Sequence, residues 1–283
     1  MHSTNDIPLE LNKVYIEDCI CTMNRMPSDF LDLTITSPPY DNMRYYDGNF
    51  KIDIERIITS LYRVTKSGGV VVWLVGDQTT NWNESGSSFK QALYFKQIGF
   101  GLFDTMIYLK KPRGACGNNQ GYWQTFEYMF VFSKGKPKTI NLICDRENKE
   151  ERKGDSGTKR LHSGQLYKHT RGGYQKYGRR TNVWEYNVGK GHSTKDNFAF
   201  SHPAIFPEKL VEDHLFSWSN EGDLVYDPFV GSGTTAKMCL KLKRNFISSE
   251  INPEYAAIAN KRVSNFTVTG INNQFILNMD EQK

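Results

Sequence analysis

The sequence predicts an α/β protein with a doubly wound, mostly parallel sheet and a basic insertion. Three observations predict this class, the first being that strand-like and helix-like segments alternate along both ends of the chain. The run Val70–Val75 is apolar without alternation, which is typical of a parallel strand buried on both faces. A Gly-x-Gly loop at Gly231 and Gly233 joins a predicted strand to a predicted helix. The length of 283 residues suits one large domain with an insertion or two modest domains.

The first half of the chain alternates strands and helices. Apolar spacing over Ile54–Val64 is typical of an amphipathic helix, and we expect Ser67-Gly68-Gly69 to end it before the next strand. Two adjacent prolines after Ser37 prevent both helix formation and strand pairing, so the chain leaves the sheet there in a fixed extended turn. The predicted strands are Lys13–Ile16, Leu31–Thr36, Val70–Val75, Phe103–Leu109 and Glu127–Phe132, and the predicted helices are Cys19–Met26, Ile54–Val64 and Phe89–Ile98.

The second half begins with a segment of a different kind. From Lys134 to about Asn197 the apolar periodicity fails, which indicates an insertion and not core. The alternation then resumes, with predicted helices at Glu208–Trp218, Thr234–Leu242 and Glu254–Val263 and predicted strands at Leu224–Tyr226 and Phe246–Ser249. We therefore expect residues 1–135 and 197–270 to form one discontinuous domain, residues 136–196 to be the insertion, and residues 271–283 to be a tail.

Positive charge is concentrated in the insertion. Residues 134–195 contain 16 Lys and Arg against 6 Asp and Glu, a balance of +10 within a net charge of +5, so the rest of the chain carries −5. Tyr167, Tyr174, Tyr177 and Trp184 lie among these charges. A solvated or disordered loop is the usual interpretation of a charged run, and the interleaved aromatic rings weaken it.

Composition excludes several classes of protein. A hydrophobic content of 38% with 13% aromatic residues is too rich for a disordered chain, and no run approaches the roughly 18 apolar residues that span a membrane. The amino terminus lacks the pattern of a signal peptide, so we expect a cytoplasmic protein with no membrane partner. The five cysteines are odd in number and include no Cys-x-x-Cys pair, which favours reduced thiols and argues against a metal site.

The loop Asp227-Pro228-Phe229-Val230-Gly231-Ser232-Gly233-Thr234-Thr235, called the Gly loop below, is a candidate nucleotide-type site. Its glycines let the backbone approach a ligand, and the helix after it offers free N–H groups. It lacks the Gly-Lys-Ser/Thr ending of an NTPase and the third glycine of the dinucleotide fingerprint. Glu250 follows Gly231 by 19 residues, at the end of the next strand, where a carboxylate can bind ribose hydroxyls. Adenosine is the predicted ligand, and a tight turn with an incidental glutamate is the alternative.

A second motif, Ser37-Pro38-Pro39-Tyr40, stands at the end of a predicted strand, where by itself it fits a rigid turn with a packed tyrosine equally well. Together with the Gly loop, it closely resembles the amino-methylating DNA methyltransferases of prokaryotes and their phages, which use S-adenosylmethionine to methylate N4 of cytosine or N6 of adenine. The order of the motifs resembles the β arrangement of that family. Further matches cover most of the chain: Tyr15-Ile16-Glu17-Asp18-Cys19, Phe126-Glu127-Tyr128 through Ser133-Lys134, and His202-Pro203-Ala204-Ile205-Phe206-Pro207.

The resemblance implies a Rossmann-like methyltransferase fold, S-adenosylmethionine as cofactor without a metal, and double-stranded DNA as substrate. An exocyclic amine is a poor nucleophile, and the Ser37 hydroxyl and Pro38 carbonyl could accept its hydrogens from a turn that the prolines hold rigid. Tyr40 would stack on a base flipped out of the duplex. The implied catalytic residues are Ser37, Pro38, Pro39 and Tyr40, and the implied cofactor-binding residues are Asp18, Cys19, Asp227, Phe229, Gly231, Gly233, Thr234, Thr235 and Glu250.

Several of these assignments have alternatives. A helix cap is as good an interpretation of Asp18 as a ligand role, and His202 fits a hydrogen-bonded structural histidine better than a base. Pro207 and Lys209 fit either the border of the methionine moiety or the start of a surface helix. The basic insertion resembles the target-recognition region of the family, which implies that it contacts DNA, and its aromatic rings among the charges agree with this because DNA readers combine charge with planar groups. A homodimer and a cognate restriction endonuclease are further candidate partners that the resemblance raises.

The target base and the reaction class leave alternatives as well. Serine at the first catalytic position is commoner for N4 of cytosine in this family, so cytosine is ranked above adenine. Methylation at C5 of cytosine is disfavoured, because that reaction needs a cysteine after a proline and none of the five cysteines follows one. The alternatives from other classes are a non-catalytic nucleic-acid-binding protein that retains the fold and a nicotinamide oxidoreductase.

Overall fold

The computed structural model describes residues 8–39, 52–111, 122–148, 156–170 and 175–280. The chain divides into two compact units, one of residues 1–141 with 182–283 and one of residues 142–181. Each unit is described by itself below. Within the described part of the chain, no helix is both long enough and apolar enough to cross a membrane.

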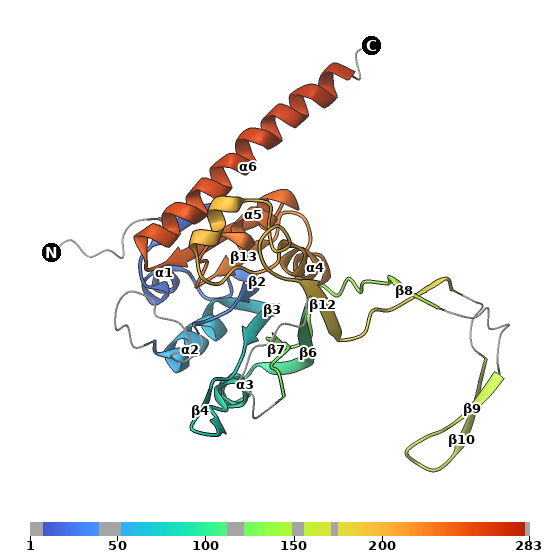
Figure 1. The fold of residues 1–283 in the computed structure, drawn as a ribbon. Helices are drawn as coiled ribbons and strands as arrows, with labels where there is room; N and C mark the ends of the chain where they lie inside the picture. The colour runs from blue at the N-terminus through green and yellow to red at the C-terminus, as the bar shows by residue number, and fades with distance from the viewer. Residues whose placement is uncertain (1–7, 40–51, 112–121, 149–155, 171–174, 281–283) are drawn as a thin grey trace. The chain divides into compact units, whose positions relative to one another are not determined.

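The larger unit is built on an eight-stranded sheet with the strand order β1-β14-β13-β2-β3-β7-β6-β12. Figure 1 labels β13, β2, β3, β7, β6 and β12 of this sheet. All neighbouring strands pair in parallel except those that pair with β7, so β7 alone runs against the other strands of this sheet. The strands are β1 (Lys13–Ile16), β2 (Leu31–Thr36), β3 (Thr65–Val75), β6 (Gly101–Lys111), β7 (Phe126–Ser133), β12 (Val183–Asn187), β13 (Leu224–Asp227) and β14 (Asn245–Glu250). The predicted mostly parallel sheet is confirmed.

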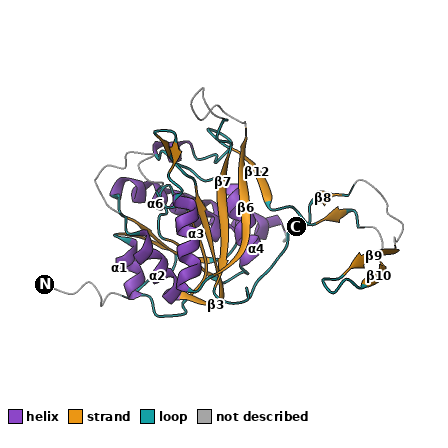
Figure 2. Ribbon diagram, turned by 90° about the horizontal axis from the view of Figure 1, so that it is seen from below, coloured by secondary structure: helices purple, strands orange, loops and turns teal. Residues whose placement is uncertain are grey.

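Helices cover both faces of this sheet (Figure 2). One group contains α1 (Cys19–Arg25), α2 (Ile54–Val64) and α3 (Ser87–Ile98), which pack side by side. The other contains α4 (Glu208–Trp218), α5 (Thr234–Lys241) and α6 (Pro253–Asp280), with the short 3₁₀ helix η2 (Asn197–Ser201) against α6. The chain winds from β2 to β3 in one direction and from β13 to β14 in the other, which is the doubly wound arrangement.

The main core lies between the sheet and the layer of α1, α2 and α3. The run Val70–Val75 of β3 is buried at every position, as its apolar sequence predicts for a central strand. Phe95 of α3 stacks on Phe132 of β7 with ring centroids 4.1 Å apart. The Trp73 indole Nε1 donates to Gln91 Oε1 at 2.7 Å, which satisfies the one polar atom of that buried side chain.

The glycines after α2 do not end that helix, contrary to the sequence-based expectation. α2 ends at Val64 and the chain turns directly into β3 at Thr65, so Ser67-Gly68-Gly69 lies inside the strand. A Cβ atom at Gly69 would stand 2.7 Å from Thr65 Cγ2 and 3.1 Å from the Leu31 carbonyl oxygen. The glycines are therefore required by a bulge, where the pairing of β2 with β3 shifts register between Leu31 and Leu33.

The insertion is shorter in the structure than the expected range of residues 136–196. Residues 183–187 form β12, which pairs with β6 and alternates exposed and buried side chains. Trp184 packs on His214 of α4 with ring centroids 4.7 Å apart, and the Tyr186 hydroxyl donates to Asp213 Oδ2 at 2.8 Å. Trp184 is therefore a core residue and not one of the exposed aromatic groups of the basic segment. The last helix also extends beyond its predicted end at Val263, since α6 runs to Asp280 and includes part of the expected tail.

The smaller unit contains two short antiparallel pairs. The strands β9 (Ser156–Arg160) and β10 (Leu166–Thr170) form a hairpin, and β8 (Arg146–Glu147) pairs with β11 (Tyr177–Gly178). Leu166 and Tyr167 are 61% and 57% exposed. A third small hairpin, β4 (Thr79–Thr80) with β5 (Asn83–Glu84), belongs to the larger unit.

Candidate active site

The two sequence motifs meet at the carboxyl edge of the sheet, where β2 and β13 lie side by side. This is the point at which the winding reverses, and the loops after the strands diverge there to leave room for a ligand. The Thr36 hydroxyl donates to Asp227 Oδ1 at 2.7 Å, in a buried hydrogen bond between residues 191 positions apart. Ser37 follows Thr36 directly, and the Gly loop begins with Asp227. The fold therefore joins the predicted catalytic turn to the predicted cofactor loop.

The predicted catalytic turn, of which Ser37, Pro38 and Pro39 are described, leaves β2 partly buried. Pro38 is buried, while Ser37 and Pro39 are half-buried at the edge of the sheet. Two consecutive prolines fix their own φ angles and remove two N–H donors, so the turn needs no ladder partners. Tyr40, the fourth predicted catalytic residue, lies outside the described residues.

Asp227 anchors the first half of the Gly loop. Its side chain is 2% exposed, and its Oδ1 accepts from the Phe229 backbone N–H at 3.1 Å as well as from Thr36. Burial raises the pKa of Asp227 to about 6, although the hydrogen bonds that the carboxylate accepts oppose the rise. Phe229 packs against the core beside this carboxylate. Asp227 therefore fixes both the backbone of the loop and the end of β2.

Two separate constraints require glycine at both Gly231 and Gly233: the backbone conformation and the lack of space for a Cβ atom. Gly231 and Gly233 have φ angles of 49° and 84°, in the left-handed region that side chains disfavour. A Cβ atom at Gly231 would stand 2.8 Å from His202 Nε2, and one at Gly233 would stand 2.7 Å from Ala259 Cα. The loop therefore packs against His202, which follows η2, and against Ala259 of α6. It leads directly into α5, whose first residues Thr234 and Thr235 are buried.

Glu250 ends β14 and turns its carboxylate toward the Gly loop. Oε2 accepts from the Gly231 backbone N–H at 2.9 Å, and Oε1 accepts from the Asn252 backbone N–H at 3.0 Å. Burial raises the pKa of this carboxyl. Each carboxylate oxygen has a second acceptor position, so a held Glu250 can still accept one hydroxyl on each oxygen. This matches the two hydroxyls of a ribose.

Asp18 and Cys19 lie at the same edge, just after β1. β1 pairs with β14 so that Ile16 stands opposite Glu250, which brings the two predicted cofactor segments together. Asp18 Oδ1 accepts from the Ile20 backbone N–H at 2.7 Å, so the side chain caps α1 as its alternative interpretation held. Cys19 is buried, its carbonyl accepts from the Tyr226 hydroxyl at 3.3 Å, and burial raises the pKa of its thiol.

Sequence reasoning missed an ionic cluster beside the Gly loop, in which a fully buried arginine meets three partly exposed charged side chains. Arg262 of α6 is fully buried and donates to Asp196 Oδ2 at 2.9 Å and to Glu208 Oε1 at 2.6 Å. Lys237 of α5 donates to the same two carboxylates at 2.8 Å each. Burial alone would raise the pKa values of Asp196 and Glu208, but the hydrogen bonds and charges of the two cations bring both below the ordinary range. One sequence signal could have indicated that Arg262 is buried. It follows the buried Ala259 by three residues, and Ala259 follows the buried Ala256 by three residues, a spacing that keeps neighbouring side chains along one side of a helix.

Comparisons with known proteins agree with this geometry. The DNA methylase family N6_N4_Mtase matches residues 31–261 of the chain. The chain belongs to this family. It is 54% identical over 241 residues to the orphan methyltransferase M.BamHII of Bacillus amyloliquefaciens, covering 84% of this chain and 90% of that protein. It is 28% identical over 276 residues to the type II methyltransferase M.BglII of Bacillus subtilis, covering 91% of this chain and 71% of that protein.

Solved structures share the fold of this DNA methyltransferase. PvuII DNA methyltransferase, which is described as cytosine-N4-specific, aligns with a TM-score of 0.63 at 20% identity over 92% of this chain and 91% of that chain. The complex of M1.HpyAVI with S-adenosylmethionine aligns with a TM-score of 0.57 at 23% identity, over 88% of this chain and 98% of that chain. The predicted fold class and the predicted family of amino-methylating enzymes of the restriction-modification type are both confirmed. The oxidoreductase alternative is wrong.

Two residues of the methyltransferase that sequence left open have structural partners. His202 Nδ1 lies 2.7 Å from the Ala204 carbonyl oxygen, to which a protonated Nδ1 donates, and the ring packs edge-on against Tyr255 with centroids 4.4 Å apart. The same ring packs against Gly231 of the Gly loop, where a Cβ atom would stand 2.8 Å from Nε2. Lys209 lies in the first turn of α4 with its side chain 61% exposed and forms ion pairs with Glu212 and Asp213.

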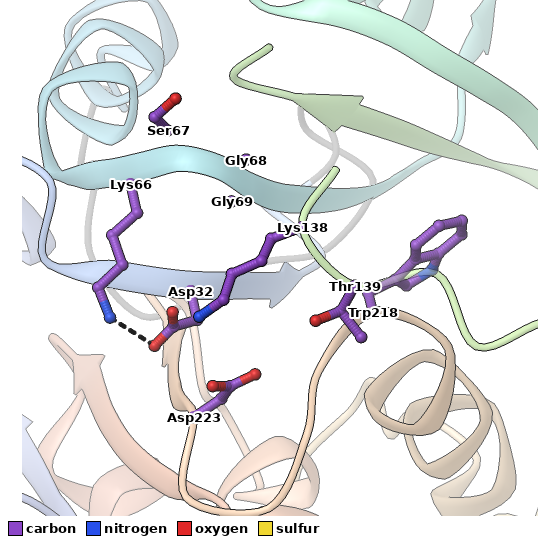
Figure 3. Close-up of a pocket in the computed structure, with 9 residues that line it drawn as sticks. All are labelled: Asp32, Lys66, Ser67, Gly68, Gly69, Lys138, Thr139, Trp218 and Asp223. Carbon is purple, nitrogen blue, oxygen red and sulfur yellow. Dashed lines mark hydrogen bonds and ion pairs between the residues drawn. The ribbon is translucent and has the colours of Figure 1, made fainter. Parts of the chain in front are cut away.

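A small pocket of the methyltransferase lies at the opposite edge of the sheet, near the amino ends of β2, β3 and β13 (Figure 3). Asp32 accepts from Lys66 Nζ at 2.7 Å and from the Leu224 backbone N–H at 3.0 Å. Both contacts are made by Oδ2 of the carboxylate. Since the catalytic turn and the Gly loop both follow the carboxyl ends of their strands, this pocket is separate from the candidate active site.

Proposed function

We propose that this DNA methyltransferase transfers a methyl group from S-adenosylmethionine to the exocyclic amine of a base flipped out of duplex DNA, and that the preferred amine is N4 of cytosine. The observation that carries the proposal is the buried hydrogen bond from Thr36 to Asp227. It fixes the catalytic turn and the Gly loop against each other at the point where the winding of the sheet reverses. A methyl donor bound at the Gly loop and a base bound at the catalytic turn would then meet at this edge of the sheet.

The residues around the Gly loop fit the proposed cofactor. Glu250 is held by two backbone N–H groups with acceptor positions left on both oxygens, which suits the hydroxyls of an adenosine ribose. Asp18, Cys19, Asp227, Phe229, Gly231, Gly233, Thr234 and Thr235 are the further proposed contacts. S-adenosylmethionine, when bound, supplies a methyl group on a sulfonium, which is an electrophile that needs no metal.

The catalytic turn supplies the acceptors for the amine. The lone pair of an exocyclic amine is delocalised into the ring, so a catalyst must favour a pyramidal nitrogen by accepting its N–H groups. The Ser37 hydroxyl and the Pro38 carbonyl are the proposed acceptors. Because the prolines fix the turn before the base arrives, the acceptors need no reorganisation during reaction. In the bound complex the nitrogen would form its bond to the methyl carbon as the carbon–sulfur bond breaks, the sulfur would keep that electron pair as a neutral thioether, and the methylated amine would release one proton to solvent.

Tyr40 is the proposed platform for the flipped base. Flipping costs a few kcal/mol in lost stacking and pairing, and stacking on an aromatic side chain offsets roughly 1–3 kcal/mol of that cost. Tyr40 follows Pro39 directly, so the rigid turn limits where its backbone can go.

The basic unit of residues 142–181 is the proposed reader of the target sequence. It contains 11 Lys and Arg against 5 Asp and Glu. Lys159, Arg160 and Lys168 are exposed on its hairpin, beside the exposed ring of Tyr167. Exposed cations can contact phosphates, and planar groups can contact bases. A homodimer and a cognate restriction endonuclease stay predictions from the family resemblance.

One experiment tests both the reaction and the base. The protein is incubated with duplex DNA and S-adenosylmethionine labelled in the methyl group, and the DNA is digested to nucleosides for mass spectrometry. Label in N4-methylcytosine is expected, because a serine stands at the first catalytic position. Label in N6-methyladenine alone would overturn the choice of base but not the reaction. Label in neither nucleoside would overturn the proposed function.

A further inference from the structure

We propose that Arg262 is a positioning residue for the Gly loop, and that it sets the affinity for S-adenosylmethionine without touching it. The inference rests on the proposed function, since it takes the Gly loop to be the cofactor site. Arg262 belongs to α6, and its side chain is 0% exposed. Any effect it has on a ligand must therefore pass through the residues that it holds.

Every N–H group of the Arg262 guanidinium has an acceptor. Nε donates to Asp196, and Nη2 donates to Glu208 and, at 3.2 Å, to the Thr194 hydroxyl. Nη1 donates to the Ser232 carbonyl oxygen at 3.1 Å and to the Thr234 hydroxyl at 2.9 Å. Nη1 also lies 3.4 Å from the Ser232 hydroxyl, so three of the six acceptors belong to the Gly loop itself. The fixed planar fork of the guanidinium sets where they lie.

The charges of the cluster balance. Arg262 and Lys237 face Asp196 and Glu208, so two cations stand among two carboxylates with no net charge left over. Burying an unpaired charge is costly, and removing one member of a buried pair destabilises strongly because its partner stays charged. Removing any one of the four charged side chains is therefore expected to destabilise the whole cluster. It fastens the Gly loop to α5, to α6 and to the segment between β12 and α4.

The loop needs such a fastening because of its own sequence. Gly231 and Gly233 hold left-handed φ angles and have the widest conformational freedom of any residue type. Glu250 holds one side of the loop through the Gly231 N–H, and Arg262 holds the other through Ser232 and Thr234. Loosening one side would require the cofactor to order the loop on binding, and that ordering lowers affinity. The acceptors of the catalytic turn would not move.

The test compares Arg262→Lys with Arg244→Lys. Lysine keeps the charge but cannot reproduce the fork, so it cannot hold both carboxylates and both loop groups at once. Arg244 is the control: its guanidinium is half-buried and donates to the Ser219 carbonyl and hydroxyl and to the Leu242 carbonyl, but it lies at the amino end of β14. Binding of S-adenosylmethionine is measured by titration calorimetry, kcat and KM are measured with DNA in excess, and melting temperature is measured for each protein.

For Arg262→Lys we expect the Kd and KM for S-adenosylmethionine to rise by about 10-fold, a change of about 1.4 kcal/mol in binding, with kcat at saturating cofactor within about 2-fold of wild type. Arg244→Lys should lower the melting temperature and leave the Kd unchanged. If both variants lose stability and both bind S-adenosylmethionine as wild type does, Arg262 is only structural and the inference is overturned. If the wild-type protein itself does not bind the cofactor, the proposed function fails instead.

A second variant covers the case in which Arg262→Lys does not fold. Glu208→Gln keeps the size and one acceptor oxygen but removes a charge from the cluster. We expect it to weaken S-adenosylmethionine binding by a few-fold, again with little change in kcat. Glu212→Gln is its control, because Glu212 lies in the same helix and pairs with Lys241 and Lys209 away from the loop. Equal affinity in the two glutamine variants would contradict the proposal.

Discussion

The carboxyl edge of the sheet and the basic unit of residues 142–181 differ in the interactions that stabilise each of them. At the edge, polar side chains are buried and bonded, as Asp227 is to Thr36 and Arg262 is to Glu208. In the basic unit, short strands pair through their backbones while Leu166 and Tyr167 remain more than half exposed. Chemistry needs groups fixed before the reaction, whereas reading DNA needs charges that reach outward. The predictions below test whether this division holds.

The largest expected effect concerns the buried carboxylate of Asp227. Its pKa in the folded protein is about 6, above the ordinary 3.8, because burial disfavours the charged form. The folded protein therefore binds more protons than the unfolded chain between about pH 4 and pH 6, and its stability falls as pH rises through that window. A rise of this size in the pKa corresponds to about 3 kcal/mol of stability. The pKa of Glu250 is also raised by burial, so part of the loss of stability is common to both proteins. We expect chemical denaturation to show a larger loss in wild type than in Asp227→Asn, and the difference is the contribution of Asp227.

The comparison must be made as a difference between the two proteins. Asp196 and Glu208 have lowered pKa values, so their contribution has the opposite sign and is lost as pH falls. That contribution is common to wild type and to Asp227→Asn and cancels in the difference. Asp223→Asn is the control, since Asp223 stands just before the other end of the same strand and accepts from the Asn220 N–H at 2.8 Å. A difference that does not change with pH would show that Asp227 is not held in the buried, costly state described here.

The sequence predicted the strands and helices that form the carboxyl edge of the sheet better than it predicted the buried contacts that support the Gly loop. The strands Lys13–Ile16 and Leu31–Thr36 and the helices Ile54–Val64 and Glu208–Trp218 have the predicted bounds, because their apolar spacing depends only on local burial. The spacing of α6 could have indicated that Arg262 is buried, but its partners Asp196, Glu208 and Ser232 could not be predicted, because they lie 30 or more residues away. Trp184 was misplaced for a related reason: the alternation of β12 is only five residues long and stands directly after a basic stretch.

The second prediction concerns Tyr40, which would complete the catalytic side of the edge. Replacing it by alanine removes the proposed stacking of the flipped base, worth roughly 1–3 kcal/mol, so turnover should fall by about 10-fold to 100-fold. Binding of S-adenosylmethionine should stay near the wild-type value, because the cofactor contacts lie on the Gly loop and Glu250. The measurements are kcat with duplex DNA and the Kd of the cofactor. Tyr94→Ala is the control, since that tyrosine joins α3 to α2 by a 3.3 Å hydroxyl contact with Thr59. Turnover that matches the control would mean that Tyr40 is merely packed.

The smallest expected effect, and the one that tests the basic unit directly, is on the salt dependence of DNA binding. In the variant Lys159→Gln, Arg160→Gln, Lys168→Gln, the plot of log affinity against log salt should flatten by roughly 0.9 for each DNA phosphate that is no longer neutralised. Catalytic turnover at saturating DNA and cofactor should change little, because these three side chains are exposed on a unit separate from the edge. The matched control neutralises Lys13, Lys241 and Lys243, which are 45%, 46% and 77% exposed on the larger unit. If the control flattens the slope as much as the hairpin variant does, DNA is attracted by the charge of the whole protein, and the division of labour between the two regions is wrong.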